Sequence, residues 1–362
     1  MLMVLDDDEI EHPPVECVFT TEEEVGLNGA KALDKSVLKA RTMINMDSED
    51  EGVATVSCAG GLRVQFTKEI QRTTVQGSLL TLKVEGLLGG HSGQDIDKER
   101  QNADLLMARM IQRLLKETKG QLVSFNGGTK DNAIPRECEA SLIYESDEEA
   151  AKAEELACEL AETYAEELTP AEPDFSCEIS CETNRTAEAI PQDAAKEFIC
   201  AMRLAPNGIQ KRNIKMDGFV VVSLNLGVVR TEEDRIVMIF SPRSSVASLQ
   251  EDTKERLNTL AETFGFTVSH SSEYPGWSFK EDSPVREICK ESYKELFGED
   301  LKIEAIHAGL ECGLFSDAIK GLDAIAIGPT IANCHTPDEY LTLDSFERFY
   351  EFLKDILSRL AK

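Results

Sequence analysis

The chain has 362 residues, 41% of them hydrophobic, which is enough for two domains that each have their own core. Its 67 Asp and Glu against 38 Lys and Arg give a formal net charge of -29 at pH 7, which argues against nucleic acid or anionic membrane as a partner. No run of eighteen apolar residues and no signal-peptide pattern is present, so a cytoplasmic protein is expected.

The first sixty residues alternate between strand and helix patterns. Residues 15–20 are apolar and β-prone, residues 25–38 are typical of a helix, and residues 42–46 predict a second short strand that ends at Asp47. Such a βαβ order indicates a parallel sheet. We therefore predict the first part of an α/β domain over residues 1–61.

The pattern changes over residues 62–272, where strands with period-two alternation, such as 78–85 and 219–226, are separated by long amphipathic helices. This texture predicts an inserted α+β domain. Two of its helices carry apolar residues along one face; these residues are Leu106, Met107, Met110, Ile111 and Leu114 in the first helix, and Leu156, Leu160, Tyr164 and Leu168 in the second.

The βα order returns over residues 273–362, with a helix at 285–297, a strand near Ile303, a strand at 324–327 and a closing helix from Ser345. Asp344 and Glu347 have the spacing of a capping box for that last helix. The simplest architecture is one α/β domain, formed by residues 1–61 and 273–362, with the second domain inserted between its two halves.

Three consecutive glutamates, residues 22–24, follow the first predicted strand. Thr21 and Glu24 have capping-box spacing, and Glu22 and Glu23 favour the positive end of the same helix, so a purely structural role explains all three. The alternative is chemical, because adjacent glutamates at a strand end can supply a general base and a metal ligand.

Other potential ligands follow neighbouring strands. Asp47 follows the strand at 42–46, and His335 follows the strand at 324–327 through a Gly-Pro-Thr segment. Carboxyl ends of parallel strands meet at one sheet edge, and carboxylate with imidazole suits zinc, cobalt or manganese. Each residue alone is more often a turn, cap or hydrogen-bonded surface residue, so only the combination predicts a metal site.

The chain has five histidines, whose contexts differ. His12 lies in an acidic, proline-rich loop and His270 at a predicted strand end, and both are interpreted as structural. His91 and His307 lie in the glycine-rich segments Leu-Gly-Gly-His-Ser-Gly-Gln and His-Ala-Gly-Leu-Glu-Cys-Gly. Glycine lets the backbone approach a ligand closely, so these two are candidate binding residues.

Six motifs in order resemble those of the aminoacyl-histidine dipeptidases, relatives of carnosinase among the two-metal hydrolases. The resemblance spans essentially the whole chain. The motifs are Thr-Glu-Glu-Glu-Val-Gly, Asn-Met-Asp-Ser-Glu-Asp-Glu-Gly, Gly-Gly-His-Ser-Gly, Phe-Asn-Gly-Gly-Thr-Lys-Asp-Asn-Ala-Ile-Pro-Arg-Glu, His-Ala-Gly-Leu-Glu-Cys-Gly-Leu-Phe and Gly-Pro-Thr-Ile-Ala-Asn-Cys-His-Thr-Pro-Asp-Glu.

The resemblance implies a Zn-peptidase-like three-layer α/β catalytic domain with an inserted α+β lid domain that also forms a homodimer. It implies two divalent metal ions, with zinc as the expected metal and cobalt or manganese as alternatives. By the same resemblance, Glu23 matches the general base of the family, and Glu24 and His335 match ligands of one ion. Asp47 resembles a ligand of the other ion.

The resemblance also implies substrate-binding residues and a substrate. His91 matches the lid histidine that reaches the scissile carbonyl, with a route across the dimer left open, and Asn132 and Arg243 match positions for the substrate's oxygens and C-terminal carboxylate. The Arg243 segment could equally be a solvated turn. His307 resembles part of a substrate-lining loop. The implied activity is metal-dependent hydrolysis of dipeptides, of the Xaa-His type with broad specificity.

The sequence departs from the family upstream of the glutamates. Family members carry there a His-x-Asp motif and a Gly-Ala-Asp-Asn-Gly-like segment, and neither is found here. We therefore expect an N-terminally truncated chain with an incomplete metal site, since two protein ligands do not make a tight zinc site. A non-catalytic dimerisation or dipeptide-binding remnant, and an N-acyl amino acid amidohydrolase of the same superfamily, remain as alternatives.

Overall fold

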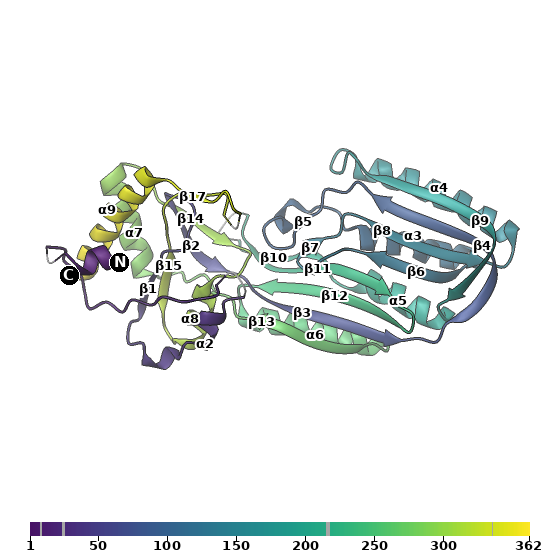
Figure 1. The fold of residues 1–362 in the computed structure, drawn as a ribbon, viewed down its shortest axis with the longest axis horizontal. Coiled ribbons are helices and arrows are strands. Elements are labelled where there is room, and N and C mark those ends of the chain that lie inside the picture. The colour runs from purple at the N-terminus through teal and green to yellow at the C-terminus, as the bar shows by residue number, and fades with distance from the viewer. Residues whose placement is uncertain (8, 24–25, 215–217, 335) are drawn as a thin grey trace. The chain divides into compact units, whose positions relative to one another are not determined.

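The computed structural model describes residues 1–7, 9–23, 26–214, 218–334 and 336–362, which Figure 1 shows as a ribbon. The chain divides into two compact units. Unit 1 comprises Met1–Gly60, Ser245–Ala247 and Tyr274–Lys362, and unit 2 comprises Gly61–Ser244 and Ser248–Glu273. Each unit is thus assembled from separate stretches of sequence around a sheet of its own.

Unit 1 contains a four-stranded mixed sheet with the order β1-β15-β2-β14. Strand β1 is parallel to β15, β15 is antiparallel to β2, and β2 is parallel to β14. The elements are α1 (Leu2–Leu5), α2 (Asn28–Ala32), η1 (Lys35–Val37), β1 (Thr42–Asn45), β2 (Val53–Cys58), α7 (Pro284–Phe297), β14 (Lys302–Ile306), α8 (Glu311–Ala318), β15 (Asp323–Ala326), β16 (Ile331–Ala332), β17 (Tyr340–Leu341) and α9 (Leu343–Leu360).

Helices α7 and α9 pack together in unit 1 (Figure 1). The ring of Tyr293 on α7 meets the ring of Phe352 on α9 edge to face, with centroids 5.2 Å apart. Local sequence sets the ends of α7, because the Ser283 side chain accepts a hydrogen bond from the Arg286 amide over 3.3 Å and Gly298 supplies a left-handed C-cap. The helix predicted at 285–297 is confirmed.

Trp277 closes the end of strand β2. Its backbone exchanges two hydrogen bonds with Cys58, of 2.9 and 3.0 Å, and its carbonyl also accepts the Ser57 hydroxyl over 2.7 Å. The indole is buried with Cys58 and Cys312. Residues far apart in sequence are therefore joined within unit 1.

The strand predicted over residues 15–20 is wrong. Residues 15–20 do not form a strand, because no backbone among the described residues pairs with them in a ladder. They are tied down differently, since the Glu16 carboxylate accepts the backbone N–H groups of Lys39 and Ala40 over 2.9 and 2.8 Å. The predicted strands at 42–46 and 324–327 correspond to β1 and β15, and the one near Ile303 to β14.

The single helix predicted over residues 25–38 is also wrong. The structure has the short helices α2 and η1 in this region, separated at Leu33 and Asp34. The Asp34 carboxylate accepts the Ser36 amide over 3.0 Å and so starts η1 instead of continuing α2. Side-chain competition for backbone N–H groups therefore overrides the helical pattern here.

Neither predicted capping box is present. Helix α2 begins at Asn28 and its N-cap is Leu27, so Thr21 does not cap it, and Glu24 lies outside the described residues. Helix α9 begins at Leu343 after Thr342, which places Asp344 in the first turn and not at the N-cap. The carboxylate of Asp344 can still favour the positive helix end.

Unit 2 is built on a nine-stranded sheet with the order β13-β3-β12-β11-β6-β8-β4-β9 and with β10 paired to β11. Neighbouring strands from β12 to β9 are antiparallel, and so are β10 and β11. The elements are β3 (Gly60–Glu69), β4 (Thr73–Glu85), β5 (Gly90–His91), η2 (Ile96–Lys98), α3 (Ala103–Glu117), β6 (Gln121–Gly127), β7 (Ala133–Ile134), β8 (Cys138–Tyr144), α4 (Asp147–Leu168), β9 (Ser176–Ala189), α5 (Gln192–Leu204), β10 (Gly208–Arg212), β11 (Val220–Thr231), β12 (Arg235–Ser244), α6 (Ala247–Thr263) and β13 (Thr267–Tyr274).

Helices α3 to α6 cover one face of this sheet and share one apolar core with it (Figure 1). All five residues predicted for the inner face of α3 are buried, and α4 buries Tyr164 and Leu168. The two amphipathic helices are confirmed. Among the described residues, no helix of either unit is long and apolar enough to cross a membrane.

Candidate functional site

Backbone hydrogen bonds join Glu23 in unit 1 to the residues that follow position 25. The Glu23 carbonyl accepts the N–H groups of Gly26 and Leu27 over 3.1 and 2.8 Å, and Glu22 has a left-handed backbone with φ 55°. Just before it, the Thr20 hydroxyl donates to the Glu311 carboxylate over 2.7 Å. This last hydrogen bond ties Thr20, three residues before the half-buried Glu23, to the first residue of α8.

The segments that follow β1 and β15 lie against each other, as expected for the ends of parallel strands. The Ile331 amide donates to the Glu49 carbonyl over 2.9 Å. Gly328 comes so close that a Cβ there would lie 1.8 Å from the Ser48 carbonyl oxygen. The exposed Asp47 and the segment that leads to residue 335 thus share one edge of the sheet.

Two of the predicted ligands, Glu24 and His335, lie outside the described residues. In the remaining ranges, no group of three or more His, Cys, Asp and Glu side chains could hold a metal ion. Glu23 and Asp47 alone therefore do not fit a zinc site, which needs at least three protein ligands. The predicted ion ligands stay a prediction that depends on Glu24 and His335.

His307 follows β14 and is buried in unit 1, with 7% of its surface exposed. The loop after it leads into α8, whose first residue is Glu311, also buried. The His-Ala-Gly-Leu-Glu-Cys-Gly motif thus joins the end of β14 to the start of α8, where Glu311 accepts the Thr20 hydroxyl. A role for His307 with substrate stays a prediction.

Unit 2 brings the other three predicted residues together. His91 ends β5, which pairs with β7 so that His91 stands opposite Ala133, the neighbour of Asn132. The Ser92 amide donates to the Asn132 carbonyl over 2.9 Å. Arg243 is buried in β12, and its positive charge is close enough to affect the pKa of His91.

The His91 ring has a defined proton arrangement. Backbone N–H groups of Gly93 and Gln94 donate to its Nδ1 over 3.2 and 3.0 Å, so Nδ1 is an acceptor and the neutral ring carries its proton on Nε2. Burial and the charge of Arg243 lower the pKa of His91, against the opposing effect of Asp95. His91 therefore offers a neutral Nε2–H donor.

Asp95 is absent from the set predicted from sequence. Its carboxylate accepts the His91 amide over 2.8 Å and its own amide donates to the His91 carbonyl over 3.0 Å. An acidic residue four positions after a histidine in a glycine-rich loop is a signal that could have indicated it, because Asp side chains commonly bond nearby backbone amides.

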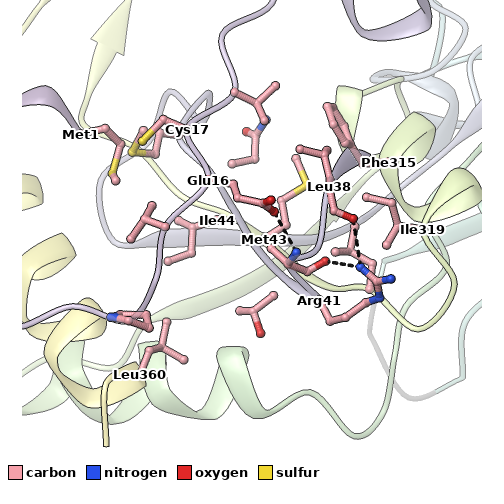
Figure 2. Close-up of a pocket in the computed structure, with 18 of the residues that line it drawn as sticks. Met1, Glu16, Cys17, Leu38, Arg41, Met43, Ile44, Phe315, Ile319 and Leu360 are labelled. Atoms are coloured by element: carbon pink, nitrogen blue, oxygen red, sulfur yellow. Dashed lines mark hydrogen bonds between the residues drawn. The ribbon is translucent and has the colours of Figure 1, made fainter. Parts of the chain in front are cut away.

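Unit 1 also contains an apolar cavity of about 410 Å³, which lies apart from the predicted site residues (Figure 2). It lies between residues 13–20 and β1, and Met43, Ile44, Phe315 and Ile319 line it. None of the described residues predicted for catalysis or binding lines it. This cavity is therefore not the candidate active site.

The family model for peptidase family M20/M25/M40 matches residues 1–359. The chain belongs to this family. It is 33% identical over 365 residues to the cytosol non-specific dipeptidase of Escherichia coli (strain K12), covering 99% of this chain and 74% of that protein. Its structure is similar to the crystal structure of aminoacylhistidine dipeptidase from Vibrio alginolyticus, with a TM-score of 0.94 and 34% identity, covering 99% of this chain and 73% of that one.

Membership of this M20/M25/M40 peptidase family confirms three expectations from the sequence: the resemblance, the α/β fold class and the class of reaction. The chain is a member of a family of peptide-bond hydrolases, with dipeptidases among its relatives. The ordered motifs in the sequence therefore predicted the family correctly.

Proposed function

We propose that the chain hydrolyses dipeptides and that Xaa-His dipeptides are among its substrates. The main support is the similarity over 99% of the chain to a non-specific dipeptidase and to an aminoacylhistidine dipeptidase. The name of the E. coli relative supports a cytoplasmic location. We assign residues 62–272 as a lid and dimerisation domain, and residues 1–61 and 273–362 as the catalytic domain.

The unit 2 residues are assigned to the substrate's polar groups. The Arg243 guanidinium binds the C-terminal carboxylate, since its planar fork suits two parallel hydrogen bonds. Asn132 binds a substrate oxygen. The Nε2–H of His91 donates to the scissile carbonyl oxygen, where negative charge develops as the carbonyl is attacked. A neutral histidine with a fixed donor suits this role.

The unit 1 residues are assigned to the water and the metal ions. Glu23 is the general base that takes the proton of the attacking water and passes it to the leaving amine. Glu24, Asp47 and His335 are the proposed ligands of two divalent ions, zinc first, with cobalt or manganese as alternatives. His307 lines the substrate. Because the described residues hold no three-ligand group, no step is assigned to the ions.

The test is a substrate profile of the purified protein supplied with zinc, cobalt or manganese. We expect hydrolysis of β-alanyl-histidine and other dipeptides, suppression by a chelator, and roughly a hundredfold loss of rate in Glu23→Gln, because the water loses its base. Glu22→Gln is the matched control, since Glu22 is the adjacent exposed glutamate and should leave the rate unchanged.

Other results would favour the alternatives. Hydrolysis of N-acyl amino acids without dipeptide hydrolysis would indicate an amidohydrolase. Dipeptide binding by calorimetry without any turnover would indicate a non-catalytic binding remnant. Measurement of bound metal in the same preparation shows whether two ions accompany the activity.

A further inference from the structure

The turn from His91 to Asp95 folds back on its own histidine ring. The two residues exchange backbone and side-chain bonds, with the His91 amide donating to Asp95 Oδ2 and the Asp95 amide donating to the His91 carbonyl. This closes the turn and directs the intervening amides of Gly93 and Gln94 at His91 Nδ1. The backbone of the turn therefore determines that Nδ1 accepts hydrogen bonds.

Asp95 is itself held in place by cations. Its Oδ1 accepts Lys98 Nζ over 2.5 Å, and Arg100 Nη1 lies 3.9 Å from the same oxygen. The hydrogen bond from Lys98, with that from the His91 amide, lowers the pKa of Asp95. Asp95 is therefore ionised at neutral pH. Arg100 also donates a hydrogen bond to the Gly89 carbonyl, just before β5.

We propose that Asp95 is a positioning residue that holds the neutral His91 ring in its Nε2–H tautomer, with Nδ1 as the acceptor. The proposal rests on the proposed function, in which that N–H donates to the scissile carbonyl. Asp95 acts on the turn and not directly on the ring, because its carboxylate accepts hydrogen bonds from the His91 backbone amide and from Lys98. Without it, the amides of Gly93 and Gln94 lose their alignment and Nδ1 can take the proton instead.

Two substitutions separate the turn from the charge. In Asp95→Asn the side-chain oxygen still accepts the His91 amide, so the turn and the Nε2–H form should persist. In Asp95→Ala that acceptor is lost, and the two neutral forms of the ring should mix. Asp97→Ala is the matched control, because Asp97 is an exposed carboxylate in η2, two residues after Asp95.

The measurement is nitrogen NMR of the histidine-labelled 362-residue chain at a pH above the histidine titration, with His91→Gln to assign the His91 signals. We expect a protonated Nε2 and an unprotonated Nδ1 in the unchanged protein, in Asp95→Asn and in Asp97→Ala. In Asp95→Ala both shifts should move toward an average. Circular dichroism confirms that each variant is folded.

Retention of the pure Nε2–H form in folded Asp95→Ala would overturn the proposal, and so would its loss in Asp95→Asn. In the dipeptide assay, Asp95→Ala should lower kcat about tenfold with little change in KM, since the donor acts mainly on the developing charge. The NMR result does not depend on turnover. The expected shifts without any dipeptide hydrolysis would therefore count against the proposed function and leave the role of Asp95 standing.

Discussion

Asp104→Asn is expected to stabilise the folded protein, with a gain that grows between about pH 5 and pH 8. Asp104 lies in the first turn of α3 and is completely buried beside the Cys138 thiol. No N–H or O–H group among the described residues donates to either carboxylate oxygen. Burial raises the pKa of Asp104 to about 8, while the Cys138 thiol and the charge of Arg230 act in the opposite direction.

Asp104 binds its proton more tightly in the folded chain than in the unfolded chain. The pKa of Asp104 is about 8 in the folded chain and near 3.8 when unfolded, so the folded chain holds an extra proton between these values. The contribution of Asp104 to stability is therefore most favourable at low pH and falls as pH rises toward 8, by up to about 1.4 kcal/mol per pH unit. Asparagine has a similar shape and no proton to lose, so the fall disappears.

Urea unfolding followed by circular dichroism at several pH values measures this difference. Glu117→Gln is the control, because Glu117 is an exposed carboxylate at the other end of α3 and should change stability by less than about 0.5 kcal/mol. If the difference between Asp104→Asn and the unchanged protein were the same at both ends of the pH range, Asp104 would not be protonated in the folded chain.

Gly128→Ala is expected to unfold or severely destabilise unit 2. Gly128 has a left-handed backbone with φ 67°, and a Cβ there would lie 1.9 Å from the backbone carbonyl oxygen of Gly227 on β11. Relief of this overlap would require a shift of the β11 backbone at Gly227 or of the segment that follows β6. We expect a loss of at least about 3 kcal/mol, because strain and steric overlap add.

Gly208→Ala separates these two causes. Gly208 has a similar φ of 74°, but a Cβ there would meet no atom within 4 Å. It should therefore cost only about 1 kcal/mol, from the left-handed backbone alone. Thermal midpoints of the two variants measure the contrast. Equal losses in both would mean that backbone conformation, and not the approach to Gly227, requires glycine at residue 128.

Periodicity was sufficient where an element buries one face and makes its own hydrogen bonds. Helix α3 was predicted from five apolar residues at helical spacing, and all of them are buried. Residues 15–20 have an equally clear strand pattern and yet form no strand, because a strand needs a partner that its own sequence does not specify. Local sequence likewise could not show that Asp34 would interrupt a helix.

Some features of the candidate site could also be predicted from sequence, and others could not. The family resemblance indicated His91, Asn132 and Arg243, and unit 2 brings these three together from β5, the segment before β7 and β12. The proton arrangement of His91 depends on the geometry of backbone amides, which residue types do not encode. Asp104 is a similar case, since a helix-capping acid and a fully buried one look identical in sequence.

Trp277 gives the protein a built-in spectroscopic reporter. It is the only tryptophan in the chain, and it is buried in unit 1 between Cys58 and Cys312. Its fluorescence therefore follows the environment of unit 1, whereas far-ultraviolet circular dichroism follows the helices and strands of both units. Comparing the two signals during denaturation would reveal whether the units lose their structure in one cooperative event or in succession.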